Sequence, residues 1–183
     1  MKRIICLCSV LTLSPLAAFC AGDKAPAKDL SNPLIDYAAY RQAVQRVEPI
    51  RGKRRLTEAE FQAKMREPGA VLFDARSGPM FARLHIAGAV NLTFPDFTEE
   101  RLAKIIPTKD TLVLIYCNNN FLGSPVAMAS KIAPASLNVS TYVTLNSYGY
   151  TNIYELGPLL DVKKTVLPLA GTEAASHAGK EAK

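Results

Sequence analysis

Two short, continuous apolar runs constrain the fold of this chain most strongly. Residues 70–74 read Ala-Val-Leu-Phe-Asp and residues 111–116 read Thr-Leu-Val-Leu-Ile-Tyr, and runs of this length are typical of strands buried on both faces. A third short strand is predicted over 86–92. Because segments of helical pattern separate these runs, we expect one α/β domain with a mostly parallel central sheet and helices on both faces.

Apolar residues recur at helical spacing over 34–47, 57–66 and 94–106, which predicts three helices. Thr57, with Glu60 three residues later, forms a capping box at the start of the second helix. Pro49 is expected to end the first helix, because proline lacks the backbone N–H that a helix interior needs.

Two further helices are predicted after the second apolar run. Ser124 followed by Pro125 is a favourable N-cap and first helical residue, so a helix is expected over 124–132. Another helix is expected to begin at Asn138. Its inward-facing residues are expected to be Val139, Tyr142, Val143 and Asn146.

The first 22 residues have the pattern of a secretory signal peptide. Lys2 and Arg3 precede an apolar centre, and small residues follow it near Cys20. We expect cleavage between Cys20 and Gly22, export, and a periplasmic location. A retained membrane anchor and a lipid on Cys20 are the alternatives. Residues 23–53 are expected to be an N-terminal extension with one helix, and residues 169–183 a disordered tail.

Charge and composition argue against several classes of function. The 183 residues carry 22 Lys and Arg against 16 Asp and Glu. Removal of residues 1–22 takes two basic and no acidic residues, so the net charge falls from +6 to 20 − 16 = +4. This mild charge argues against a nucleic-acid partner. Two histidines and no Cys-x-x-Cys motif argue against a metal site, and no cofactor is expected. The basic residues that we interpret as a solvated face are Arg46, Arg51, Lys53, Arg54 and Arg55.

Cys117 directly follows the second apolar run and is the single cysteine left of four once residues 1–22 are removed. It is therefore either an inert buried residue or a reactive thiol. Parallel sheets bind ligands at the carboxyl ends of their strands, which favours a reactive thiol. We expect the amides of the following loop and the N-terminus of the 124–132 helix to stabilise a nucleophilic thiolate. The residues of this expected anion cradle are Asn118, Asn119, Asn120, Phe121, Leu122, Gly123 and Ser124.

Four segments resemble the rhodanese family of sulfurtransferases: 72–76 (Leu-Phe-Asp-Ala-Arg), 81–91 (Phe-Ala-Arg-Leu-His-Ile-Ala-Gly-Ala-Val-Asn), 114–117 (Leu-Ile-Tyr-Cys) and 148–157. The resemblance covers residues 54–168 and implies a single rhodanese-like domain. It also implies that Cys117 takes sulfane sulfur from a small donor and carries it as a persulfide. The acceptor would be cyanide or a thiol, either small or on a protein.

The resemblance assigns supporting roles and shows departures. Asp74 and Arg76 would bind loop backbone and brace the sheet, and His85 would be a hydrogen-bonded core residue. The loop over 118–123 is neutral, whereas relatives that use thiosulfate carry a cation there, so the selection of an anionic donor would rest on backbone amides or on a distant cation such as Arg83. Gly123 stands where the phosphatase and arsenate-reductase branch needs an arginine, which argues against that chemistry.

The region between Ser124 and Gly149 is longer than in a typical family member. We interpret the extra residues as an insertion over 133–147. A binding module is the alternative function, and the uncharged loop after Cys117 is the feature that favours it. It would dock a partner through the Cys117 loop and this insertion, without useful turnover.

Overall fold

The protein is described by a computed structural model that covers residue 30 and residues 32–175. Contacts divide the chain into residues 1–35 and residues 36–183, and the fold below is that of the second unit. The expected signal peptide, residues 1–22, and its cleavage site lie outside the described residues.

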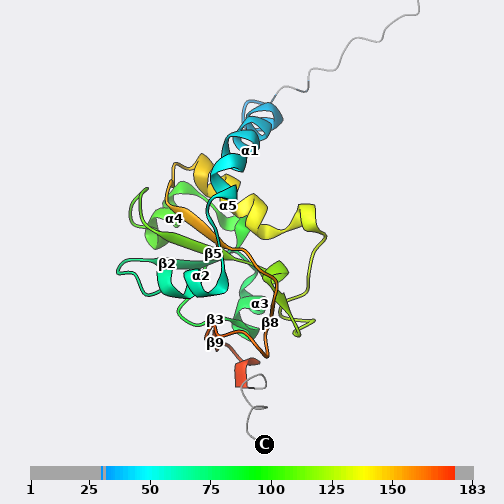
Figure 1. The fold of residues 1–183 in the computed structure, drawn as a ribbon. Coiled ribbons are helices and arrows are strands. Elements are labelled where there is room, and N and C mark those ends of the chain that lie inside the picture. The colour runs from blue at the N-terminus through cyan, green and yellow to red at the C-terminus, as the bar shows by residue number, and fades with distance from the viewer. Residues whose placement is uncertain (1–29, 31, 176–183) are drawn as a thin grey trace, which may run out of the picture. The chain divides into compact units, whose positions relative to one another are not determined.

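A five-stranded, all-parallel sheet forms the centre of the domain (Figure 1). In spatial order its strands are β1 (Arg55–Leu56), β7 (Ile153–Leu156), β5 (Val113–Tyr116), β2 (Val71–Asp74) and β4 (Val90–Asn91). The middle strand, β5, is buried along its whole length. A strand buried on both faces has no polar side, which is why its sequence is an uninterrupted apolar run.

Helices cover both faces of the sheet, which confirms the predicted α/β architecture (Figure 1). On one face lie α1 (Tyr37–Gly52), α4 (Glu99–Ile105) and α5 (Leu137–Ser147). Their buried side chains share a core with Val113 and Ile115 of β5. On the other face, Phe61 of α2 (Glu58–Lys64) packs in a core that contains Leu114 and Tyr116. The helix α3 (Gly78–Arg83) follows β2, and the 3-10 turn η1 (Phe94–Asp96) precedes α4.

The first helix extends beyond its predicted end. Pro49 lies inside α1, which continues to Gly52. The missing N–H of proline removes one helical hydrogen bond. The last turn is held instead by Arg51, whose guanidinium binds both carboxylate oxygens of Glu155 in β7 at 2.7 Å. The buried residues of α1 belong to the core, so this part of the expected N-terminal extension packs as part of the domain.

The second helix begins as predicted, with a capping box. Thr57 Oγ1 accepts a hydrogen bond from Glu60 N at 3.3 Å, and Glu60 Oε2 accepts one from Thr57 N at 2.8 Å. The hydrogen bonds from the Thr57 backbone and side chain lower the pKa of Glu60. The reciprocal bonds fix the first residue of α2.

No helix forms over 124–132, so that prediction is wrong. Residues 125–128 make a single turn, closed by a 2.8 Å hydrogen bond from Met128 N to Ser124 O. The carbonyls of residues 127 and 129 instead accept hydrogen bonds from the side chains of Arg76 and Asn118. Because side-chain donors compete with the backbone for these carbonyls, the turn does not continue into a helix.

The other helix of this region lies close to its predicted position. After the 3-10 turn η3 (Ala133–Ala135), α5 begins one residue before Asn138. Of the four residues predicted to face inward, Tyr142 and Val143 are buried, and Val139 and Asn146 are half-buried.

Residues 86–92 form parts of two strands rather than one. Gly88, with φ at 84°, turns the chain between β4 and a second short strand, β3 (His85–Ile86). β3 pairs antiparallel with β9 (Leu169–Ala170), so the tail that we expected to be disordered starts with a strand. A side chain at Gly171 would place its Cβ 2.5 Å from Arg83 O, so this close approach requires glycine. Residues 176–183 of the tail lie outside the described residues.

Candidate active site

Cys117 stands at the carboxyl end of β5, where parallel sheets bind their ligands. Its backbone remains extended, with φ at −148° and ψ at −176°. The side chain therefore continues the row of Val113 and Ile115 toward the layer of α1 and α5. The thiol is free, the residue is 1% exposed, and Sγ lies 3.5 Å from the hydroxyl oxygen of Ser136.

Residues 129–136, here called the strap, are tied to the Cys117 loop by two asparagine side chains. Asn118 Nδ2 donates to Ala129 O. Asn119 Nδ2 donates to Lys131 O at 2.8 Å, and its Oδ1 accepts from Lys131 N at 3.0 Å. The strap ends at Ser136, whose hydroxyl contacts the thiol.

Asn120 uses its full hydrogen-bonding capacity to fix the backbone around the thiol. Its Oδ1 accepts from Cys117 N and from Asn138 Nδ2, both at 3.0 Å. Its Nδ2 donates to Leu156 O at 2.8 Å and to Pro158 O at 3.2 Å. One buried side chain thus joins the end of β5 to the end of β7 and the start of α5.

Of the amide cradle that we expected around the sulfur, the structure shows one contact, in which the backbone N–H of Asn120 donates to the Cys117 side chain. The residues after Cys117 make a 3-10 turn, η2 (Asn118–Asn120). In this turn the N–H groups of Asn120 and Phe121 bond to the carbonyls of Cys117 and Asn118. Without a helix over 124–132, the positive end of a helix dipole is missing as well. The three asparagines also contribute side chains that organise the site.

The second half of the predicted cradle makes contacts elsewhere. Phe121 and Leu122 form β6 (Phe121–Leu122), which pairs with β8 (Leu160–Asp161). Phe121 is buried and meets the Tyr116 ring edge-on, whereas Leu122 is exposed. Gly123 has φ at 90°, and the Ser124 hydroxyl donates to Glu173 at 3.3 Å.

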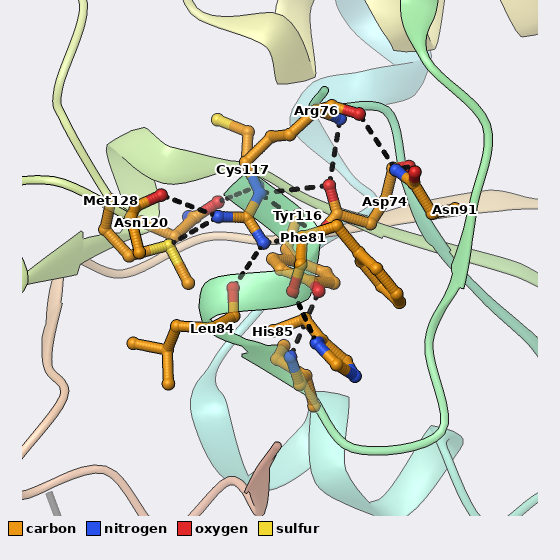
Figure 2. Close-up of polar contacts among 12 residues, drawn as sticks. Asp74, Arg76, Phe81, Leu84, His85, Asn91, Tyr116, Cys117, Asn120 and Met128 are labelled. Carbon is orange, nitrogen blue, oxygen red and sulfur yellow. Dashed lines mark hydrogen bonds and ion pairs between the residues drawn. The ribbon is translucent and has the colours of Figure 1, made fainter. Parts of the chain in front are cut away.

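Asp74 and Arg76 form a buried ion pair with an N–O distance of 2.6 Å (Figure 2). Arg76 Nη2 also donates to Leu84 O at 2.7 Å, and Nη1 donates to Ala127 O at 2.9 Å. Burial lowers the pKa of Arg76, but the hydrogen bond and charge of Asp74 outweigh it, and the pKa is raised. With all three guanidinium nitrogens engaged, Arg76 joins the end of β2 to the segments after α3 and after the Cys117 loop.

His85 and Arg83 lie in the region around α3. His85 Nδ1 lies 2.7 Å from Phe81 O, and the two rings stack with centroids 3.8 Å apart (Figure 2). Arg83, the expected distant cation, pairs with Glu173 at 2.7 Å. It lines none of the three cavities that border the strap. The first residues of the tail place Glu173 beside Arg83. The carboxylate of Glu173 therefore balances the positive charge that we expected to bind an anionic donor.

Three cavities border the strap, and two of them are lined by Asn118 or by Ser136. The larger, ≈ 440 Å³, has a mainly apolar lining that includes Phe94, Asn118 and Lys131. The smaller, ≈ 250 Å³, includes Ser136, whose hydroxyl contacts the thiol. Its other polar lining residues are Arg51, Arg55, Asn119, Asn120, Asn138 and Glu155.

Sequence reasoning missed Ser136, Asn138 and the two arginines as site residues. The basic run was visible in the sequence, but nothing local indicated that it returns to the end of β7 across about a hundred residues. Within residues 30 and 32–175, no group of three metal-ligating side chains occurs. No helix in that part of the chain is long and apolar enough to cross a membrane.

The fold and the place of the thiol define a class: α/β domains with a parallel sheet and a cysteine at the carboxyl end of a central strand. The family model described as "Rhodanese-like domain" matches residues 57–157. The chain therefore belongs to the family of rhodanese-like domain proteins.

Several solved structures are similar to this chain. The BH2092 protein from Bacillus halodurans is 17% identical, with 75% of this chain and 87% of that chain covered and a TM-score of 0.47. The rhodanese-like domain of the Alr3790 protein from Anabaena is also 17% identical, with coverages of 71% and 86% and a TM-score of 0.47. A rhodanese from E. coli is 23% identical, with coverages of 56% and 98% and a TM-score of 0.38. Comparison with curated proteins gives no match.

Proposed function

We propose that this chain is a sulfurtransferase in which Cys117 carries sulfane sulfur as a persulfide. The observation that carries the proposal is the position of the thiol. Cys117 is a free cysteine at the carboxyl end of the central strand, in contact with a hydroxyl that lines a cavity. Membership of the rhodanese-like family supports the same chemistry.

The reaction consists of two displacements at sulfur. In the first, the Cys117 thiolate attacks the outer sulfur of the donor. The S–S bond of the donor breaks, and its electron pair leaves with the remaining fragment, which is sulfite when the donor is thiosulfate. In the second, cyanide or an acceptor thiolate attacks the terminal sulfur of the persulfide, and the electron pair of the broken S–S bond returns to Sγ. The Ser136 hydroxyl is placed to donate a hydrogen bond to the sulfur anion.

Formation of thiocyanate from thiosulfate and cyanide tests this proposal. We expect Cys117→Ser to abolish it, and Ser136→Ala to slow it by about tenfold, because one hydrogen bond to a charged group is lost. Ser130→Ala is the matched control, since Ser130 is an exposed residue of the same strap. Thiocyanate formation by Cys117→Ser at the wild-type rate would contradict the proposal.

A binding module is the second candidate, and two observations favour it. Cys117 is 1% exposed, and large apolar side chains near it on the chain are exposed: Leu122, Val126 and Ile132, at 51, 53 and 76%. Such a module would dock a partner through the Cys117 loop and residues 133–147. The rate at which the native protein reacts with a thiol reagent separates the candidates. A sulfurtransferase reacts in the folded state, whereas a docking module reacts only when unfolded.

We further propose that residues 1–22 direct export and are removed, so that the enzyme meets its small sulfur donor and its thiol acceptor in the periplasm. N-terminal sequencing of the protein recovered from a periplasmic extract tests this. Sequence beginning between residues 21 and 23 is expected, and recovery of the full-length chain from the cytoplasm alone would contradict it.

A further inference from the structure

The basic run that we interpreted as a solvated face sends two of its arginines to one buried carboxylate. Arg51 binds both oxygens of Glu155 at 2.7 Å, and Arg55 Nε binds one of them at 2.9 Å. Glu155 is 1% exposed, whereas the two arginine side chains are 28% and 51% exposed. One carboxylate cannot neutralise two guanidinium groups, so the cluster carries one uncompensated positive charge.

Both guanidinium groups keep a donor for a ligand. Arg51 uses Nε and Nη2 on Glu155, and Arg55 uses Nε on Glu155 and Nη2 on Gly157 O. Within the described part of the chain, Nη1 of neither arginine has a hydrogen-bond partner. A second open polar group lines the same cavity: Asn138 is 5% exposed, and its Oδ1 has no partner among the described residues.

The charged cluster lies on the same face of the sheet as the thiol. Glu155 is in register with Ile115, and Cys117 is two residues further along β5, so all three side chains point to the α1 and α5 layer. The ≈ 250 Å³ cavity beside the cluster is lined by both arginines and by Ser136, whose hydroxyl contacts Sγ. A ligand in this cavity therefore meets a positive charge and the hydroxyl that contacts Sγ.

We propose that Arg51 and Arg55 form the anion-binding part of the Cys117 site and select sulfur donors that carry negative charge beside the sulfane sulfur. They supply the cation that the neutral Cys117 loop lacks. Both residues precede residue 57, so they lie outside the segment that matches the family. A guanidinium group suits this role because its planar donors bind oxyanions in fixed geometry. The selection of donors rests on the proposed sulfurtransferase function, whereas anion binding itself does not.

Thiosulfate binding to the Cys117→Ser protein tests the subsite without any transfer of sulfur. We expect Arg51→Gln and Arg55→Gln each to raise the Kd measured by calorimetry about tenfold, because one charge-assisted contact is lost. Arg46→Gln is the matched control. It removes the same charge from an exposed position of α1 that does not line the cavity, and we expect less than a twofold change. Unchanged binding in both cavity variants, or equal weakening by Arg46→Gln, would overturn the proposal.

Two further measurements keep the test decisive. In wild-type Cys117 protein, Arg55→Gln is expected to raise KM for thiosulfate about tenfold and leave kcat within twofold, since it removes binding rather than chemistry. If Arg51→Gln does not fold, Arg55→Gln carries the test, because the bidentate bond from Arg51 to Glu155 remains. Binding that depends on the arginines without thiocyanate formation refutes the transfer function alone. Transfer with a KM that is independent of them refutes the subsite alone.

Discussion

Replacement of Asn120 by alanine tests how the chain positions its cysteine. The side chain makes four hydrogen bonds, two as acceptor and two as donor, with distances between 2.8 and 3.2 Å. It is 5% exposed, so water cannot readily replace it. The substitution leaves Cys117 N–H and Leu156 O without these partners at the ends of two central strands.

The expected cost follows from these bonds. A typical hydrogen bond contributes about 1 kcal/mol net, and a buried group left without a partner costs about 1–3 kcal/mol. We expect Asn120→Ala to lower the free energy of unfolding by about 3–4 kcal/mol. At about 2–4 °C per kcal/mol for a chain of this size, Tm falls by about 6–16 °C.

Urea unfolding followed by circular dichroism measures this loss. Asn152→Ala is the control, because Asn152 makes one exposed hydrogen bond, to Asp110 O at 3.1 Å, and its loss should cost below about 1 kcal/mol. Asn120→Asp keeps the acceptor for Cys117 N but turns an oxygen toward the carbonyls of Leu156 and Pro158. It should be destabilised at neutral pH and recover as the carboxyl group protonates. Equal losses for Asn120→Ala and Asn152→Ala would refute the reasoning.

Three further predictions follow from the buried and capping groups. Arg76→Met should lower the free energy of unfolding by about 3–5 kcal/mol by leaving Asp74 buried and unpaired, and Asp74→Leu in the same chain should restore part of it; a double variant no more stable than Arg76→Met would contradict this. The pKa of Glu60 is lowered in the fold by its bonds with Thr57, so its contribution to stability is present above its unfolded pKa and is lost as pH falls. Glu60→Gln should therefore flatten the acid limb of a plot of urea midpoint against pH, and an unchanged limb would count against the capping box. Burial, reinforced by the charge of Asp74, raises the pKa of Tyr116 well above its ordinary value, so in an alkaline absorbance titration this phenol should ionise only with unfolding. If the Tyr116→Phe protein shows one ionising tyrosine fewer than the wild type in the native-state titration, Tyr116 ionises in the folded protein and the prediction is wrong.

The parts of the fold that were predictable from sequence depend on local signals. The apolar run of β5 could be recognised because a strand covered on both faces carries apolar residues at every position. The start of α2 could be recognised because both partners of the capping box lie within four residues. The position of Cys117 followed from the same logic, since it is the residue after the run.

The parts that were missed depend on contacts between distant segments. Ser124 and Pro125 are a sound helix start, but donors from Arg76 and from Asn118 take the carbonyls that the helix would need. The continuation of α1 through Pro49 depends on the contact between Arg51 and Glu155, which are more than a hundred residues apart in the sequence. The cluster around Glu155 depends on the same contact. The residues next to an arginine in the sequence carry no information about such distant partners. The sequence alone therefore does not distinguish an arginine on a solvated face from one that lines a cavity.

Intact-protein mass spectrometry of the chain after treatment with thiosulfate or polysulfide tests the central claim most directly. The account predicts a gain of the mass of one sulfur atom that is absent from Cys117→Ala and is removed by cyanide with release of thiocyanate. A folded protein that gains no sulfur from either donor, or that gains it equally in Cys117→Ala, would contradict the claim that Cys117 is a persulfide carrier.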